Sequence, residues 1–214
     1  FTTSADPDKI LKIVKPLASA TWDVGREFGT IAAQIGDHKI EITSYRADSY
    51  DKDSRKPTVE FGDNLEDDLK RRDFTVNAMA LRLPSKTFVD PHQGLRDLML
   101  ETLRTPAAPE ISFSDDPLRM MRAARFTSQL GFELDPAAFA AMRDMASRIE
   151  IISAERVRDE LSKLLISKNP QPGLELLVES GIAELVLPAL PALRLEVDEH
   201  HHHKDVYQHS LTVV

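Results

Sequence analysis

No cysteine occurs in the sequence, and no long apolar run does either. Without cysteine the chain can form neither disulfide bonds nor metal sites with thiolate ligands. A protein without disulfides fits a reducing compartment, so we expect a cytoplasmic location. No apolar stretch approaches the roughly 20 residues that a membrane-spanning helix needs, and no signal peptide opens the chain. We therefore expect no membrane partner.

The sequence also lacks a net positive charge, since its formal charge is −8 at pH 7. This balance excludes a bulk electrostatic attraction to nucleic acid. It does not exclude a nucleic-acid partner, because local basic patches can hold a polyanion against an acidic background. Any such patch must be sought in short stretches of the sequence.

The sequence does contain enough apolar material for a folded core. Of the 214 residues 42% are hydrophobic, which suits one large domain or two small ones. We find no internal repeat. The sequence starts at Phe1 instead of a methionine, inside an expected element, so we expect a fragment of a longer protein.

Local signals in the first part of the chain predict helices and strands together. Asp6 or Ser4 can cap a helix that has a proline in its first turn. Gly36 and Asp37 separate two β-rich runs and predict a hairpin, in whose second strand apolar and polar residues alternate. The polar stretch 47–63 is typical of a mobile loop.

The pattern becomes helical further along the chain. Asn64 predicts the start of a helix, and residues 84–86 separate two short predicted strands. From about residue 95 nearly every segment is helical. Start and stop signals recur there. Ser114 is expected to begin an arginine-rich helix, and Gly131 to end it. Asp135 and Ser153 are expected to begin two further helices, and Gly181 to end the one after them. The layout is α+β at the front and all-helical behind.

The stretch DDPLRMMRAAR, residues 115–125, has the most informative charge pattern. Arg119, Arg122 and Arg125, here called the arginine stripe, recur at every third position, and Asp116 lies one step of three earlier. Side chains three positions apart on a helix differ in direction by about 60° around the axis, so the four side chains share one broad half of the helix. The arginines span about 9 Å along the axis, which matches an extended triphosphate, whose oxygens guanidinium groups bind well. Three residues of the opposite half are predicted to pack in the core: Met120, Met121 and Ala124.

The same spacing also fits a solvated basic face that pairs with nearby acids. Two features favour a ligand instead. Phe126 and Leu130 fall close to the stripe, so this side of the helix is not expected to be simply exposed. Asp116 beside Arg119 supplies both acceptors and donors, the combination that reads the edge of a planar base. On spacing alone the two interpretations are evenly balanced.

A second polar cluster lies in RRDFTVNA, residues 71–78. Arg72 and Asp73, with Asn77 nearby, can hold a phosphate and a ribose hydroxyl. Alone, the cluster is better explained as a helix end, where Arg71 and Arg72 interact favourably with the helix dipole. Glu41 is a similar case, because a single carboxylate on a strand is usually solvated and binds a metal only with partner carboxylates beside it.

Three motifs, RRDFTVNAMA, DDPLRMMRAARF and ERVRDELSKLL, occur in this order. Together they resemble the class II tRNA nucleotidyltransferases, the CCA-adding enzymes, and the bacterial poly(A) polymerases that share their head domain. The ending DEHHHHKDVYQHSL is similar to the start of the HD-type C-terminal domain of actinobacterial-like members. The resemblance covers almost the whole chain, and three long motifs in order are highly specific.

The resemblance implies an α+β fold. A partial nucleotidyltransferase head, with a mixed or antiparallel β-sheet and helices, would be followed by an all-helical neck and body. The implied domains are the head at 1–95, a helical base-reading and neck domain at 96–168, and a helical body with the start of the HD-type domain at 169–214. The family's glycine-rich phosphate loop and Asp-x-Asp metal pair are expected before residue 1, so this sequence lacks the catalytic carboxylates.

The resemblance also implies roles for single residues in the front half. Arg72 would contact the incoming nucleotide, and Asp73 would lie near its ribose. Asn77 belongs to the same nucleotide-binding set. Glu41 matches a carboxylate near the metal site, where Mg²⁺ is the expected ion.

In the arginine-rich helix, Asp116 and Arg119 match the pair that reads the Watson–Crick edge of CTP or ATP. Arg122 and Arg125 match the arginines that neutralise the triphosphate. These assignments imply an enzyme that adds C and A from CTP and ATP to the 3′ end of tRNA and releases pyrophosphate. Two alternatives stay open: a poly(A) polymerase that uses ATP on RNA 3′ ends, and a non-catalytic RNA-binding helical module.

Overall fold

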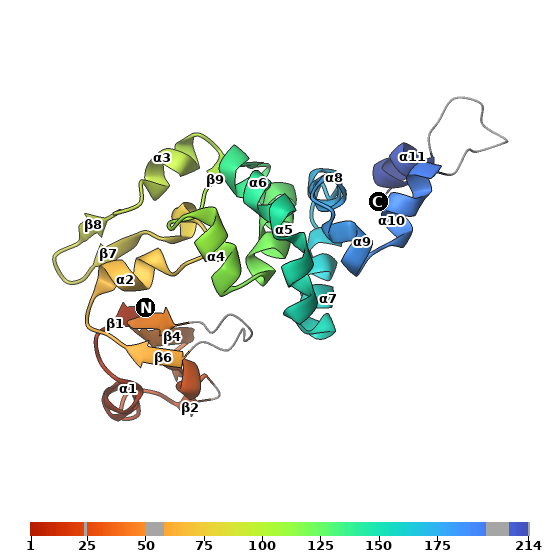
Figure 1. Ribbon diagram of the computed structural model, residues 1–214. Coiled ribbons are helices and arrows are strands. Elements are labelled where there is room, and N and C mark those ends of the chain that lie inside the picture. The colour runs from red at the N-terminus through yellow and green to blue at the C-terminus, as the bar shows by residue number, and fades with distance from the viewer. Residues whose placement is uncertain (24, 50–57, 196–205, 214) are drawn as a thin grey trace. The chain divides into compact units, whose positions relative to one another are not determined.

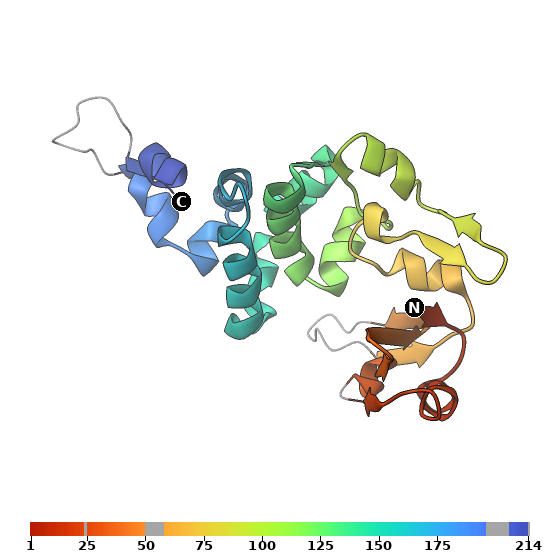
Figure 2. The ribbon, with the colours of Figure 1, turned by 180° about the vertical axis from the view of Figure 1, so that it is seen from behind.

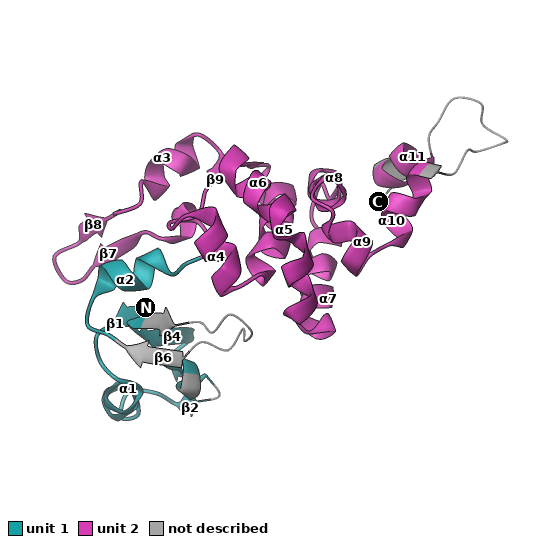
Figure 3. Cartoon of the chain, viewed as in Figure 1, with its two compact units in different colours: residues 1–51, 56–72 teal, residues 52–55, 73–214 magenta. Residues whose placement is uncertain are grey.

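The computed structural model describes residues 1–23, 25–49, 58–195 and 206–213 (Figure 1). The described residues form two compact units, drawn in different colours in Figure 3, with the boundary between Arg72 and Asp73. The division into residues 1–95, 96–168 and 169–214 stays a prediction.

A four-stranded sheet forms the centre of the first unit. Its strand order is β1-β4-β3-β2, with β1 parallel to β4 and the other neighbours antiparallel. The predicted hairpin is confirmed, and Gly36 takes the left-handed conformation in its turn with φ of 55°. The strands are β1 (Thr2–Thr3), β2 (Ala20–Trp22), β3 (Thr30–Ile35) and β4 (His38–Ser44).

Helix α1 (Pro7–Val14) packs against this sheet. Asp6 caps it as predicted, since its Oδ1 accepts a hydrogen bond of 2.8 Å from the backbone N–H of Lys9. Ile10 and Val14 are buried, and with β3 side chains they form the small core of this unit.

The predicted loop at residues 47–63 is wrong at both ends. β5 (Arg46–Ser49) and β6 (Thr58–Phe61) pair as an antiparallel two-stranded sheet, and residues 50–57 lie outside the described residues. Strands are held together by backbone hydrogen bonds, which need no apolar side chains. A stretch whose composition is typical of a loop can therefore still form paired strands. The predicted helix start at Asn64 is confirmed: α2 (Leu65–Lys70) begins there, and Asn64 Oδ1 accepts from the backbone N–H of Glu66 at 2.9 Å.

The second unit is mostly helical, and the predicted short strands around residues 84–86 are confirmed. None of the helices formed by the described residues has the length and apolar character of a membrane span. The elements in chain order are η2 (Thr75–Asn77), β7 (Ala80–Arg82), β8 (Thr87–Val89), α3 (Gly94–Met99), β9 (Thr102–Leu103), α4 (Pro109–Asp115), α5 (Leu118–Leu130), β10 (Glu133–Leu134), α6 (Pro136–Asp144), η3 (Ala146–Ile151), α7 (Ala154–Leu165), α8 (Gln171–Glu179), α9 (Ile182–Val186), α10 (Ala189–Ala192), η4 (Leu193–Leu195) and α11 (Val206–Val213).

The arginine-rich helix, α5, is the central helix of this unit and lies beside α7 and α8 in both views (Figures 1 and 2). As predicted, one half of α5 packs in the core, and three of its side chains are fully buried: Met120, Met121 and Ala124. Gly131 ends the helix in the left-handed conformation, with φ of 73°.

The predicted helix start at Ser114 is wrong. Ser114 lies inside α4, and α5 begins only at Leu118. Pro117 separates the two helices because it offers no backbone N–H and disfavours a helical conformation in the residue before it. That residue, Asp116, is accordingly extended, with φ of −142° and ψ of 98°.

Gly173 permits the close approach of α8 and α5. A methyl carbon at this position would overlap the backbone oxygen of Ala124 and lie 2.5 Å from Ser128 Oγ. Ser128 Oγ also accepts a hydrogen bond of 2.9 Å from the N–H of Gly173, so the side chain is not free to move away. We expect Gly173→Ala to lower the free energy of unfolding by about 1–3 kcal/mol, measured by urea denaturation. An unchanged unfolding midpoint would show that this contact is not tight.

Tyr207 in α11 predicts a pH dependence. Its side chain is buried, and burial raises the pKa of its phenol above the ordinary value of 10.0, although Arg194 opposes this. A raised pKa favours the neutral phenol in the folded state, so this stabilisation is complete below pH 10.0 and is lost as pH rises through the folded pKa. We expect α11 to loosen only above pH 10, which a phenolate absorbance titration of wild type against Tyr207→Phe would detect.

Candidate nucleotide-binding site

The second polar cluster is anchored to α5 by an aromatic pair. Phe74 is fully buried, and its ring meets that of Phe126 edge to face with centroids 5.7 Å apart. The next residue, Thr75, donates its backbone N–H to the oxygen of Arg104 at 2.8 Å. These contacts fix the segment that follows Asp73 against the helix that carries the arginine stripe.

Asp73 and Arg122, which the sequence predicts as separate site residues, form an ion pair. Their Oδ2 and Nη2 atoms are 2.5 Å apart, and the Asp73 side chain is only 8% exposed. Asp73 Oδ1 accepts hydrogen bonds from its neighbour's backbone N–H, at 2.8 Å, and from Asn77 Nδ2, at 3.1 Å. The structure therefore brings three of the predicted residues together, and Arg122 keeps 36% of its side chain exposed.

Arg119 is buried rather than solvated, with 7% of its surface exposed. Its Nη1 donates to Ser112 Oγ at 2.8 Å and to the backbone oxygen of Ser112 at 3.3 Å. Ser112 belongs to α4, and nothing in its sequence context indicated that it would hold a guanidinium group. The contact fixes the orientation of Arg119 before any ligand binds.

Asp116 does not lie on the arginine-rich helix, and this corrects the expectation that one helix presents all four side chains. It occupies the extended junction between α4 and α5, where its Oδ1 accepts from the N–H of Leu118 at 3.1 Å. Its Oδ2 lies 3.5 Å from Nη2 of Arg156 in α7. The acid is thus fixed at the start of α5, where its backbone oxygen also accepts from the N–H of Arg119 at 3.0 Å, although the junction and not the helix supplies it.

Arg125 connects α5 to α7. Its Nε lies 2.6 Å from Glu160 Oε2, and the two side chains are 12% and 9% exposed. Its Nη1 donates to Gln129 Oε1 at 2.8 Å, and its guanidinium lies 4.1 Å from the centroid of the Phe126 ring. This arginine therefore has a structural role, and its predicted contact with a triphosphate stays a prediction.

Together, these contacts partly decide whether the arginine stripe is a solvated basic face or a ligand-binding surface. The expected pairing with nearby acids is found for Arg122 with Asp73 and for Arg125 with Glu160. The arginines are nevertheless not a solvated face, because each contacts a side chain of another part of the second unit. Only Arg122 is substantially exposed, and of the three it is the most accessible to an anionic ligand.

Arg72 belongs to the first unit. Its Nη2 lies 3.2 Å from Asp68 Oδ2, and Arg71 Nη2 lies 2.6 Å from Asp68 Oδ1. Asp68 is fully buried, so it holds both arginines at the end of α2. Sequence reasoning missed Asp68, although spacings of three and four residues on a helix were the signal. The predicted contact of Arg72 with a nucleotide stays a prediction.

Glu41, the predicted metal-site carboxylate, is exposed on β4. Among the described residues no three His, Cys, Asp or Glu side chains gather closely enough to hold a metal ion. The described residues therefore do not by themselves fit an Mg²⁺ site, and the role of Glu41 stays a prediction. The histidine run at 200–203 lies outside the described residues.

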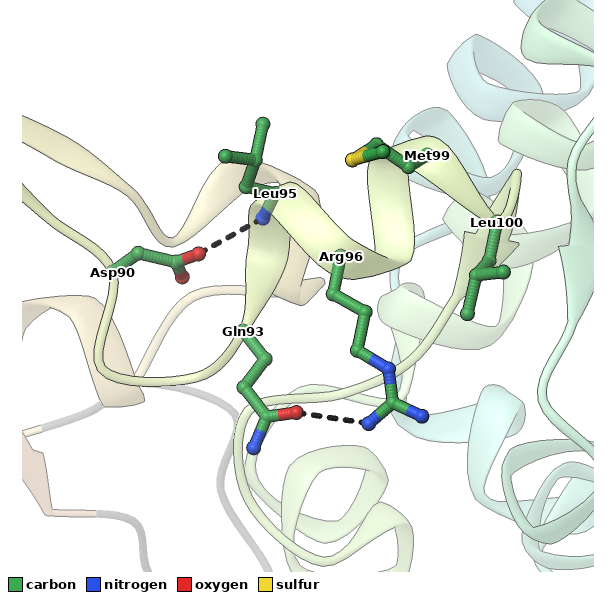
Figure 4. A pocket seen from close by; sticks show the side chains of 6 residues that line it. All are labelled: Asp90, Gln93, Leu95, Arg96, Met99 and Leu100. Atoms are coloured by element: carbon green, nitrogen blue, oxygen red, sulfur yellow. Dashed lines mark hydrogen bonds between the residues drawn. The ribbon is translucent and has the colours of Figure 1, made fainter.

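A pocket of about 570 Å³ lies on α3 (Figure 4). Asp90 faces it, but its Oδ2 accepts from the N–H of Leu95 at 2.9 Å and thereby caps α3. The other lining residues are Gln93, Arg96, Met99 and Leu100, and none of the lining residues was predicted to bind nucleotide.

Comparison with known proteins gives two family matches. Residues 1–104 match the Poly A polymerase head domain. Residues 131–193 match the family described as the probable RNA and SrmB-binding site of polymerase A.

Individual relatives point the same way. The chain is 39% identical over 185 residues to the CCA-adding enzyme of Lactobacillus helveticus, which covers 86% of the chain and 45% of that protein. It is similar to the crystal structure of the Bacillus stearothermophilus CCA-adding enzyme in complex with CTP, with TM-score 0.75, 37% identity, and coverage of 85% of this chain and 42% of that one. It is also similar to a tRNA nucleotidyltransferase complexed with a primer tRNA and an incoming ATP analogue, with TM-score 0.69, 26% identity, and coverage of 99% and 64%. The chain thus spans less than half the length of the curated relatives it matches.

Proposed function

The chain belongs to the class II nucleotidyltransferase family of CCA-adding enzymes, and from that premise we propose that the protein adds C and A from CTP and ATP to the 3′ end of tRNA. Relatives solved with CTP, and with a primer tRNA and an ATP analogue, support these substrates. The observation that carries the proposal is that Asp116 and Arg119 lie together at the start of α5, where the N–H of Arg119 donates to the backbone oxygen of Asp116 at 3.0 Å and each side chain is held by other residues.

In this proposal Asp116 and Arg119 read the base. Asp116 accepts a hydrogen bond from the amino group of C or A, while Arg119 donates to ring acceptors. G and U carry a carbonyl oxygen where C and A carry the amino group. Two hydrogen-bond acceptors, this oxygen and the Asp116 carboxylate, would then face each other without a proton between them. A buried mismatched pair is costly, so the site rejects G and U. Ser112 supports this role because it holds the Arg119 guanidinium in place.

The phosphates are proposed to lie along the rest of the stripe. The 3′-hydroxyl of tRNA attacks the α-phosphorus of the nucleoside triphosphate. The bond between the α-phosphorus and the oxygen that bridges to the β-phosphorus breaks, and pyrophosphate leaves. Arg122 supplies fixed positive charge to the triphosphate, and Asp73 orients that guanidinium. Mg²⁺ is the divalent ion we propose for the reaction, and the described residues do not by themselves form its site.

The two ends of the stripe should respond differently to truncation. We expect Arg119→Ala to lower the discrimination among the four nucleoside triphosphates by about tenfold or more, the value of a charged hydrogen bond. Arg125→Ala should instead lower stability, because Arg125 bonds Glu160 and not a base. Single-nucleotide incorporation by both variants measures this, and an equal loss of selectivity would contradict the division of roles.

The function itself is tested with protein expressed from the complete reading frame. Given a tRNA that lacks its CCA end, the protein should add cytidines when CTP is the only nucleotide supplied. It should add the terminal adenosine from ATP only after the cytidines are in place. The name of the matching head-domain family favours one alternative, a poly(A) polymerase, which would extend RNA with ATP alone. Binding of tRNA without incorporation of any nucleotide would instead indicate a non-catalytic RNA-binding protein.

We also propose a cytoplasmic location, where tRNA is processed.

A further inference from the structure

The sheet of the first unit has two different faces. Along β3, Ile31 and Ala33 are buried and contribute to the core with α1. The residues between them point to the opposite face because side chains alternate along a strand. Strand pairing adds neighbours from β2 and β4 to that second face, which carries Trp22, Thr30, Ala32, Gln34, Lys39, Glu41 and Thr43.

Trp22 is the only tryptophan of the chain, and it lies on this polar face with 42% of its surface exposed. Lys39 reaches over β3, so that its Nζ lies 5.2 Å from the centroid of the indole ring. An indole exposed on a sheet and accompanied by a cation offers a flat apolar surface and a positive charge together.

The strand register places Trp22 in one row with Glu41. Trp22 pairs with Ala32, and Ala32 pairs with Glu41 on its other side. Two strand spacings separate the ends of the row, which is about 10 Å. Because Ala32 has only a methyl group, the middle of the row is low, and the long side chain that crosses it toward the ring is that of Lys39. A flat group that stacks on the ring displaces the Lys39 ammonium from the ring face and keeps it as a neighbouring cation.

We propose that this face binds the 3′-terminal nucleotide of single-stranded RNA, with its base stacked on Trp22 and its phosphate near Lys39; this rests on the proposed function. Aromatic side chains on sheets stack unpaired bases, and a nearby cation attracts the backbone. An apolar protein partner fits less well because the face that carries the ring also carries Gln34, Lys39 and Glu41, and the Lys39 ammonium lies over the ring. The row ends at Glu41, the carboxylate predicted near the metal site, so the stacked nucleotide would be the one that is extended.

Trp22 fluorescence tests the contact in the 214-residue chain, since no other tryptophan contributes. Titration with a single-stranded RNA of six cytidines should lower the emission by about twofold, saturably, and less at high salt. CTP alone should leave the emission nearly unchanged. Emission unaffected by the RNA would overturn the proposal, and equal quenching by CTP would overturn the assignment to an RNA end.

Kinetics of protein expressed from the complete reading frame give the second test. Trp22→Ala should raise KM for the RNA substrate about tenfold, the value of one stacked base, and leave KM for CTP and kcat within about twofold. Trp22→Phe should have a smaller effect, because a phenyl ring still stacks. Phe28→Ala is the matched control, since Phe28 is an aromatic residue of the same unit that is 44% exposed but lies in η1 (Arg26–Phe28) outside the sheet.

An unchanged KM for RNA in Trp22→Ala, or an equal rise in Phe28→Ala, would overturn the proposal. A wild-type protein that extends no RNA would contradict the proposed function instead. The fluorescence titration of the 214-residue chain decides the RNA contact separately in that case.

Discussion

An Asp116→Asn enzyme should incorporate CTP and ATP about 10- to 100-fold less efficiently and should lose part of its selectivity against GTP and UTP. The carboxylate accepts a charged hydrogen bond worth about 1.5–3 kcal/mol, and each 1.4 kcal/mol corresponds to a factor of about ten. An asparagine side chain can present either an oxygen or an amino group to the base, so the barrier against a carbonyl-bearing base falls. The ratio of kcat/KM values for CTP and UTP measures the change.

The same substitution should leave the fold intact. Asp116 accepts from the N–H of Leu118, and asparagine serves this capping role about as well as aspartate. Asp135→Asn is the matched control, because Asp135 caps α6 in the same way, with Oδ1 3.0 Å from the N–H of Ala137, but is not part of the proposed base site. Equal kinetic losses in the two variants would show that the effect comes from helix capping and not from base reading.

Glu160→Ala should lower the free energy of unfolding by about 3–5 kcal/mol, the largest stability effect we expect. The substitution leaves Arg125 without its carboxylate partner, in a place where the two side chains are 12% and 9% exposed. Replacing both members by methionine should cost less than Glu160→Ala, because no unpaired buried charge remains. Guanidinium chloride denaturation of the 214-residue chain measures both.

Asp159→Ala supplies the comparison for this experiment. Asp159 lies on the same helix, but it is exposed and its contact with Arg158 is 3.4 Å long. An exposed pair of this kind contributes about 0–1 kcal/mol, so the variant should be nearly as stable as wild type. A loss below about 1 kcal/mol in Glu160→Ala would mean that the Arg125–Glu160 pair does not hold α5 to α7.

Features that depend on neighbouring residues could be predicted from the sequence. Asp6, Asn64 and Asp135 were predicted as helix starts, and each accepts a hydrogen bond from the first turn of its helix. The turn at Gly36 and the helix end at Gly131 were predicted too, because a left-handed backbone there favours glycine. The start of α5 was mispredicted since two helices meet there, and Pro117, not the predicted cap Ser114, decides the boundary.

The partners of the site residues could not be predicted in the same way. The motifs identified Asp116, Arg119, Arg122 and Arg125, but pairs such as Arg125 with Glu160 join residues 35 positions apart. Such contacts depend on how α5 packs on α7, which no local signal encodes. Sequence spacing alone thus treated the stripe as one surface, whereas in the structure its members are buried to different extents and contact different elements.

A crystal structure of the protein expressed from the complete reading frame with bound CTP tests the base-reading claim most directly. We predict that the amino nitrogen of cytosine lies about 3 Å from a carboxylate oxygen of Asp116, with Arg119 facing the ring acceptors of the same base. A cytosine bound elsewhere, with Asp116 still contacting only Arg156 and the N–H of Leu118, would contradict it.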